Sequence, residues 1–183
     1  MPTVYVSFSA QIDVTTTETL IAALAQQANQ GVDHVYLMLS TPGGTVMNGL
    51  NLYNVLRAMP FKLTTHNVGN VDSIGNAVFL AGEERFACPH STFMFHGVGL
   101  DVQNTRLEQK NLQESLDFIL RDQERIGGIL QERTNLNAGE TVELFREART
   151  KDAAFALEKG LVHNIRDIEI PPGSPIISLV FQR

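Results

Sequence analysis

The sequence predicts a single α/β domain in which βαβ units with right-handed crossovers build a largely parallel sheet. Strand-like apolar segments alternate with longer amphipathic segments over residues 4–81. Glycine-containing turns separate several of these segments. The 183 residues, 43% of them hydrophobic, suffice for one sizeable core, and no repeat or linker divides them. We therefore expect one domain over residues 1–183.

The amino-terminal part is expected to contain three strands and three helices. The strands are rich in apolar and β-branched residues and cover Val4–Ser9, His34–Ser40 and Lys62–Val68. The helices cover Thr15–Asn29, Val46–Met59 and Ser73–Ala81. Ligand sites in parallel sheets lie at the carboxyl ends of the strands. Three small residues fall at these ends, namely Gly43, Gly44 and Ser73.

A long polar segment at residues 103–133 favours a single helix with a thin apolar stripe. The stripe consists of Leu107, Leu112, Leu116, Ile119, Ile126 and Leu130, and it is interrupted by Gly127 and Gly128. Two interpretations stay open. The stripe either packs on its own domain or contacts another subunit.

Shorter elements are expected after this helix. A helix begins within Asn137–Val142, and Asp152 is expected to cap another helix that ends at Gly160. Residues 169–183 form a carboxyl-terminal extension, with a turn-rich spacer and then a strand at Ile176–Phe181. We expect this strand to join a sheet edge of this chain or of a neighbour.

Three groups of residues point to nucleophilic catalysis. Pro42, Gly43 and Gly44 follow a buried strand, and glycines at such a turn let backbone N–H groups face an oxyanion. Alone, this motif is typical of a tight turn. Ser73 opens the next apolar helix, where it is expected to be reached by His96 from a neighbouring strand. The combination, in this order, favours a serine nucleophile.

These segments resemble the Clp proteolytic subunit family, serine peptidases of the ClpP/crotonase-like superfamily. The resembling segments are STPGGTVMNGLNLYNVLRAM (residues 40–59), GNVDSIGNAVFLAG (69–82) and FACPHSTFMFHG (86–97). The resemblance runs from about Val4 to about His163. It implies a ClpP/crotonase-like fold of repeated βαβ units, with residues 103–133 as a protruding helix through which two rings stack.

Carried over by position, the resemblance makes Ser73 the nucleophile and His96 the general base. It makes Gly44 and Ile74 the oxyanion-hole donors. Ile74 follows the nucleophile in the first helical turn, where unpaired N–H groups and the helix dipole favour an anion.

The sequence departs from the family pattern at the group that orients the histidine. Counting back from the glycine-leucine turn at Lys159–Val162, the aspartate is expected at the position of Ala148. Glu147 is one residue away and is the first candidate for the orienting carboxylate, with Asp152 as the second. Asp72 is a further departure, because the family pattern has a small apolar residue before the nucleophile.

Three functions remain open on this basis. The first is a serine endopeptidase that cleaves peptides or unfolded proteins through an acyl-enzyme inside a homo-oligomer of stacked rings. The second is a ring-forming homologue without catalysis, which Ala148 and Asp72 favour. The third is a crotonase-type acyl-CoA enzyme. An ATP-driven unfoldase stays open as a partner, although the strand at Val4 begins where the family has an extra amino-terminal segment.

The substrate cleft is expected to be apolar. Six residues near the site would line it, namely Val46, Met47, Ile74, Met94, Val98 and Leu100. The segment Gly97–Leu100 is expected to pair with an extended peptide as an added strand.

Composition excludes several other functions. The net charge of −6, from 20 acidic and 14 basic residues, argues against nucleic acid as a partner. The five histidines lack metal-ligand spacing, so we expect neither a metal nor another cofactor. The lone cysteine, Cys88, excludes an intrachain disulfide, and no apolar segment reaches membrane-spanning length. We expect a cytoplasmic protein.

Overall fold

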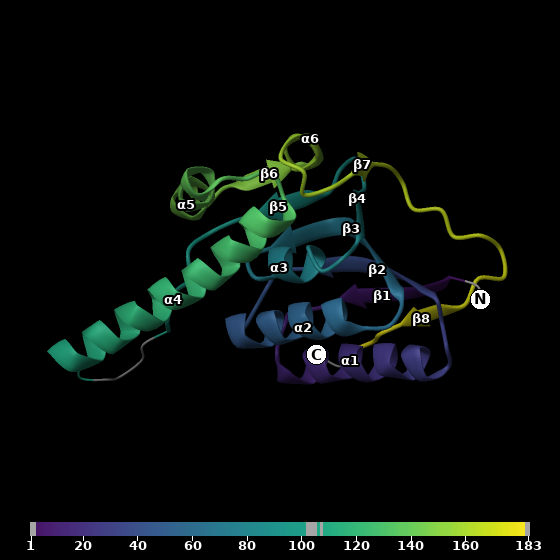
Figure 1. Ribbon diagram of the computed structural model, residues 1–183, viewed down its shortest axis with the longest axis horizontal. Coiled ribbons are helices and arrows are strands. Elements are labelled where there is room, and N and C mark those ends of the chain that lie inside the picture. Colours follow the sequence, from purple (N-terminus) through teal and green to yellow (C-terminus); the bar gives the residue numbers. More distant parts are fainter. Residues whose placement is uncertain (1–2, 102–105, 107, 182–183) are drawn as a thin grey trace.

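In a computed structural model that describes residues 3–101, 106 and 108–181, the chain forms a mixed α/β fold around one eight-stranded sheet (Figure 1). The strands are β1 (Val4–Ser9), β2 (His34–Thr41), β3 (Lys62–Asp72), β4 (Glu84–Ala87), β5 (Thr92–Met94), β6 (Thr150–Asp152), β7 (Asn164–Ile165) and β8 (Ile176–Ser178). The helices are α1 (Val14–Asn29), α2 (Val46–Ala58), α3 (Gly75–Phe79), α4 (Gln109–Arg133), α5 (Ala138–Glu147) and α6 (Ala153–Glu158).

The sheet is parallel apart from one pair of strands, which confirms the predicted fold class. Its main path runs β6-β5-β3-β2-β1-β8, and β4 pairs with both β3 and β7. Only β5 and β6 are antiparallel among the described pairs. The first three βαβ segments bury apolar side chains between the sheet and the helices, including Phe8, Leu37, Leu39 and Phe79.

Strand β3 is longer than predicted, and this extension positions the nucleophile turn. Residues 64–67 of β3 pair with β4, whereas Asn70–Asp72 pair with Thr92–Met94 of β5. The predicted strand ends at Val68, but the backbone of Asn70–Asp72 beyond it joins the ladder to β5. Helix α3 consequently begins at Gly75 rather than at Ser73, and it ends at Phe79.

Helix α4 begins at Gln109, later than predicted, and it continues through Gly127 and Gly128 without a break. Residues 103–105 and Leu107 of the predicted helix lie outside the described residues. The carboxyl-terminal half packs on the domain and buries Ile126, Ile129 and Leu130. The amino-terminal half projects from the body of the molecule (Figure 1) and exposes Leu112, Leu116, Phe118 and Leu120. Packing on its own domain is therefore observed for the carboxyl-terminal half, and contact with another subunit stays an expectation for the amino-terminal half.

The extension ends in a shorter strand than predicted. Strand β8 covers Ile176–Ser178 and pairs in parallel with Tyr5–Ser7 of β1 in the same chain. Asp152 caps α6 as predicted, since its carboxylate accepts a hydrogen bond from the Phe155 N–H (2.8 Å), but the helix ends at Glu158.

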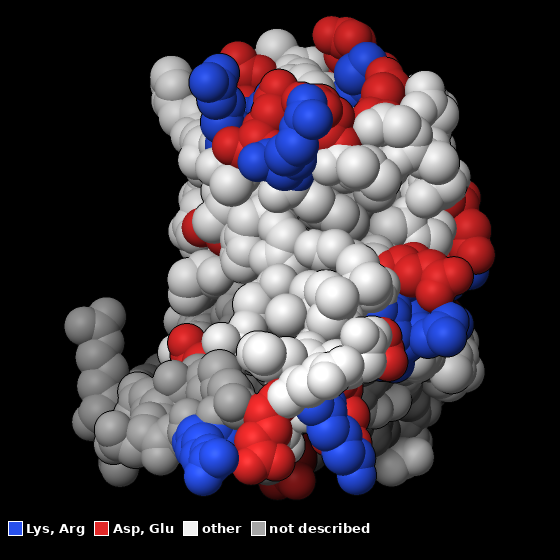
Figure 2. All heavy atoms as spheres, turned by 90° about the vertical axis from the view of Figure 1, so that its left-hand side faces the viewer, with Lys and Arg blue, Asp and Glu red and all other residues white. Residues whose placement is uncertain are grey.

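The charged side chains are mixed in sign. Figure 2 shows the face toward which α4 projects, and lysine and arginine are interspersed there with aspartate and glutamate. Ion pairs such as Lys110–Glu114 and Arg121–Glu124 link them along α4. Among the described residues, no helix combines the length and the hydropathy that a membrane crossing requires.

Buried Arg85, a residue of β4, joins three other parts of the chain. It is 5% exposed, and its guanidinium donates to the carbonyls of Leu161 (2.7 Å), Gly82 (3.1 Å), Arg133 (2.9 Å) and Gly160 (3.2 Å). These carbonyls belong to the end of α4 and to the loops that follow α3 and α6. Burial lowers the pKa of Arg85 to about 10, so the group stays charged at neutral pH.

Fully buried His66 is neutral and makes two hydrogen bonds to oxygen, and Cys88 Sγ lies 3.5 Å from its Nε2 as a further contact. Its Nε2 lies 3.0 Å from the carbonyl oxygen of Arg166, which only accepts, so Nε2 carries the proton. Its Nδ1 therefore accepts from the Tyr36 hydroxyl at 2.6 Å. Burial lowers the pKa of His66 from 6.5 to about 4.

This depressed pKa predicts a loss of stability in acid. The neutral imidazole stabilises the fold fully above pH 6.5, and this contribution is lost as the pH falls toward 4. The shift corresponds to about 3 kcal/mol of unfolding free energy. Urea unfolding between pH 4 and pH 7 should show a shallower pH dependence for His66→Gln than for the parent. Parallel pH profiles for the two proteins would contradict the prediction.

Candidate active site

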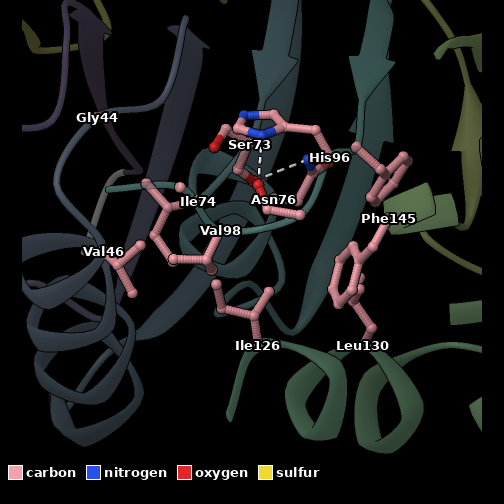
Figure 3. A pocket seen from close by; sticks show the side chains of 13 residues that line it. Gly44, Val46, Ser73, Ile74, Asn76, His96, Val98, Ile126, Leu130 and Phe145 are labelled. Atoms are coloured by element: carbon pink, nitrogen blue, oxygen red, sulfur yellow. Dashed lines mark hydrogen bonds between the residues drawn. The ribbon is translucent and has the colours of Figure 1, made fainter. Parts of the chain in front are cut away.

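A cavity of about 110 Å³ lies where β2, β3 and β5 end, against α4 and α5. It brings together the four residues predicted to act on the substrate, which are Gly44, Ser73, Ile74 and His96 (Figure 3). The apolar side of the cavity is formed by side chains that include Val46, Val98, Ile126, Leu130 and Phe145.

Ser73 occupies a strained turn between β3 and α3. Its φ is 57°, in the left-handed region that residues other than glycine rarely adopt. The turn is held because the Ser73 N–H donates to the Met94 carbonyl at 2.8 Å. Asn76 Nδ2 donates to the carbonyls of both Ser73 (3.0 Å) and Met94 (2.8 Å). Ser73 is thus fixed against β5, the strand that leads to His96.

Two backbone N–H groups lie beside Ser73 at the cavity, those of Gly44 and Ile74. Neither the Gly44 N–H nor the Ile74 N–H donates to any residue that the structure describes. Gly44 has φ of 152°, and a Cβ at this position would run into the main chain of Ile12. The parallel bridge to Ile12 uses the neighbouring groups, the Gly43 carbonyl (2.8 Å) and the Thr45 N–H (2.9 Å). The arrangement leaves two N–H groups available to an oxyanion.

His96 lies two residues beyond β5 and is exposed. Its Nδ1 is 2.7 Å from the Gly97 carbonyl oxygen. Because that oxygen only accepts, Nδ1 carries the proton and the Nε2 lone pair is left free. A free Nε2 is what a general base requires. No hydrogen bond joins the described side chains of Ser73 and His96, and such contacts commonly tighten only when substrate binds.

The two carboxylates considered for orienting His96 are engaged elsewhere. Glu147 pairs with Lys151 at 2.7 Å, which lowers the pKa of Glu147. Ala148 ends α5 in a left-handed conformation with φ of 50°, and Asp152 caps α6. Neither Glu147 nor Asp152 therefore makes a hydrogen bond or an ion pair with His96.

Asp72 is also held away from the cavity. Its carboxylate accepts from Asn70 Nδ2 at 2.6 Å, and Asn70 in turn contacts Ser40 and the Thr41 carbonyl. Alternation along β3 places Asn70 and Asp72 on the same face of the strand.

The predicted apolar cleft is reproduced in part. Val46, Ile74 and Val98 line the cavity, whereas Met47, Met94 and Leu100 do not. The segment expected to pair with a peptide already has partners, because the Gly97 N–H donates to the Phe145 carbonyl and the Val98 N–H to Gln123 Oε1, both at 3.1 Å.

Sequence reasoning missed Asn76 and Gln123. Asn76 is 1% exposed, lines the cavity and fixes the Ser73 turn. The sequence signal for Asn76 is a single amide side chain within an otherwise apolar five-residue helix. Gln123 lies in a long polar helix, where nothing distinguishes it from its neighbours.

No group of three or more histidine, cysteine, aspartate or glutamate side chains among the described residues is arranged to hold a metal ion.

Comparisons with known proteins agree on one family. The family model for Clp protease matches residues 2–169. An ATP-dependent Clp protease proteolytic subunit 2 from Thermobifida fusca (strain YX) is 25% identical over 146 residues, which span 79% of this chain and 68% of the relative. The fold is similar to a solved structure of a ClpP1 mutant from Listeria monocytogenes, with a TM-score of 0.79 and 20% identity. The alignment covers 90% of this chain and 91% of that one.

Proposed function

This chain belongs to the Clp protease family, and on that premise we propose that it is a serine endopeptidase that uses Ser73 and His96. Its substrates are peptides or unfolded protein segments that reach the cavity in extended form. The observation that carries the proposal is the strained Ser73 turn beside two N–H donors that have no partner in the described part of the chain.

The proposed reaction has two halves. Ser73 Oγ attacks the peptide carbonyl carbon while its proton passes to His96 Nε2, and the N–H groups of Gly44 and Ile74 bind the oxyanion. The C–N bond then breaks, His96 gives its proton to the leaving amine, and an acyl-enzyme remains. Water, deprotonated by His96, attacks the ester carbonyl, and the acid product leaves as Ser73 regains its proton.

We further propose that the chain assembles with copies of itself. The exposed apolar side chains on the amino-terminal half of α4, Leu112, Leu116, Phe118 and Leu120, support this proposal. These side chains lie on a projecting part of α4 and bury little surface within the chain, so we expect a second subunit to pack against them. The resemblance to ring-forming peptidases favours stacked rings as the form of assembly.

A specific observation favours a second candidate, a ring-forming homologue without catalysis. No carboxylate among the described residues hydrogen-bonds to His96, and Ala148 occupies the position expected for one. In the standard serine-protease triad, disabling the orienting aspartate lowers turnover by about 10⁴-fold.

Labelling with a fluorophosphonate separates the two candidates. We expect intact-mass spectrometry to show one adduct per chain on the parent, mapped to Ser73, and none on Ser73→Ala or His96→Ala. The reason is that phosphonylation needs the activated hydroxyl and the same oxyanion donors as peptide cleavage. The same samples are examined by light scattering, where assembly should give a mass above 20.2 kDa. An assembled parent that remains unlabelled would favour the second candidate.

A further inference from the structure

The backbone just after His96 supplies the hydrogen-bond partner of its ring. The Gly97 carbonyl accepts the Nδ1 proton at 2.7 Å. This contact selects the tautomer with a free Nε2, which is the role that a carboxylate has in the standard triad. The orientation of His96 consequently depends on where the Gly97 carbonyl points.

Two contacts from other elements hold this short segment. The Gly97 N–H donates to the Phe145 carbonyl of α5 at 3.1 Å. The Val98 N–H, on the other side of the Gly97 carbonyl, donates to Gln123 Oε1 of α4 at 3.1 Å. The peptide plane that carries the Gly97 carbonyl also carries the Val98 N–H, so Gln123 fixes the plane directly.

The approach of Gln123 to this segment is close. A Cβ added at Gly97 would lie 2.5 Å from Gln123 Oε1, so the amide fits there because residue 97 is glycine. The oxygen assignment of the Gln123 amide follows from chemistry, since only the oxygen accepts from an N–H.

Helix α4 places Gln123 firmly. Asp122 beside it is 4% exposed, and Ile126, one turn later, is 7% exposed in the core. Val98, whose N–H bonds to Gln123, lies between Gly97 and Gly99, and glycine restricts the backbone dihedral angles little. The peptide plane is thus set by the helix rather than by local preference.

We infer that Gln123 is a positioning residue for the general base, because it holds the peptide plane whose carbonyl selects the tautomer of His96. This inference rests on the proposed function, in which His96 Nε2 accepts the Ser73 proton. It also gives the chain a neutral orienting group where the family pattern has an aspartate.

Two substitutions of similar size test the inference. Gln123→Met removes the acceptor while keeping a side chain of similar length. Gln123→Glu keeps an acceptor oxygen for the Val98 N–H. Gln123→Glu replaces the amide Nε2, which donates to no described residue, so this substitution removes no hydrogen bond of Gln123.

The first readout is independent of activity. The imidazole nitrogens of His96 are observed by ¹⁵N NMR near pH 8 in the full chain, with His96→Gln identifying the signal. We expect the Nδ1–H form to dominate in the parent and in Gln123→Glu, and the Nε2–H form to gain population in Gln123→Met. Unchanged nitrogen shifts in Gln123→Met would overturn the inference.

The second readout is the rate of Ser73 labelling by the fluorophosphonate. Small misplacement of a catalytic group costs up to about 100-fold, so we expect Gln123→Met to react at least about 10-fold more slowly than the parent. Gln123→Glu should recover most of that loss. A parent that is not labelled, with the tautomer shift still present, would reject the endopeptidase and retain the positioning role. Normal labelling of Gln123→Met would reject the positioning role alone.

Discussion

Replacing Gly44 with alanine is expected to lower kcat/KM for peptide cleavage by about 100- to 1000-fold, the usual cost of losing one oxyanion donor. The added Cβ cannot fit against the main chain of Ile12, and the φ of 152° disfavours alanine. The turn must therefore shift, which moves the Gly44 N–H away from the cavity. The measurement is the hydrolysis rate of a fluorogenic peptide, with the labelling rate of Ser73 as a second reading.

Gly128→Ala is the matched control for this prediction. Gly128 lies in α4, and an added Cβ there meets nothing within 4 Å. The substitution should preserve activity and raise helix stability by roughly 0.5–1 kcal/mol. If Gly44→Ala unfolds like the parent and keeps more than half its activity, the Gly44 N–H is not an oxyanion donor.

Replacing Arg85 with methionine is expected to lower the unfolding free energy by roughly 3–5 kcal/mol. Methionine approximates the length of the side chain but donates no hydrogen bond. The carbonyls of Leu161, Arg133 and Gly160 therefore lose their partner, and the Gly82 carbonyl keeps only the Arg133 guanidinium. The carbonyl of Arg133 lies at the end of α4, where a cation also stabilises the helix dipole. Urea unfolding at pH 7 measures the change.

Two further variants sharpen this test. Arg85→Lys should recover little, because one ammonium cannot reproduce the fork of donors that serves carbonyls on different loops. Arg121→Met is the control, since Arg121 is 74% exposed and its pair with Glu124 is a surface ion pair. Such pairs contribute about 0–1 kcal/mol. An equal loss of unfolding free energy in Arg85→Met and Arg121→Met would show that the hydrogen bonds of Arg85 do not stabilise the fold.

Much of the fold could be predicted from local patterns. The bounds of β1 agree with the expectation, and α1 and α2 differ by one residue at an end, because each element is marked by periodicity and a turn or cap. The predicted end of β3 at Val68 was wrong, because the strand continues by pairing with β5, a segment distant in the sequence. Gly69, Asn70 and Asp72 have turn propensity, and the ladder overrides it.

Those residues of the candidate site that belong to recognisable sequence motifs could be predicted. Gly44, Ser73, Ile74 and His96 do surround one cavity, since the ends of neighbouring parallel strands converge. Their catalytic roles remain predictions. The left-handed Ser73 turn, in place of a first helical turn, depends on backbone contacts to Met94 that no local pattern reports. Gln123 was missed for the same reason.

The pairing of β8 with β1 has a consequence for biosynthesis. Strand β1 precedes every other strand of the sheet in the chain, yet among the described residues its outer edge is paired by residues 175–179. This edge therefore stays open during synthesis until that segment has left the ribosome. An unpaired edge flanked by buried residues such as Val6 and Phe8 is a template for pairing with another chain. Chains that stall before residues 175–179 are made therefore expose a strand edge, prone to pairing with other chains, that β8 covers in the folded domain.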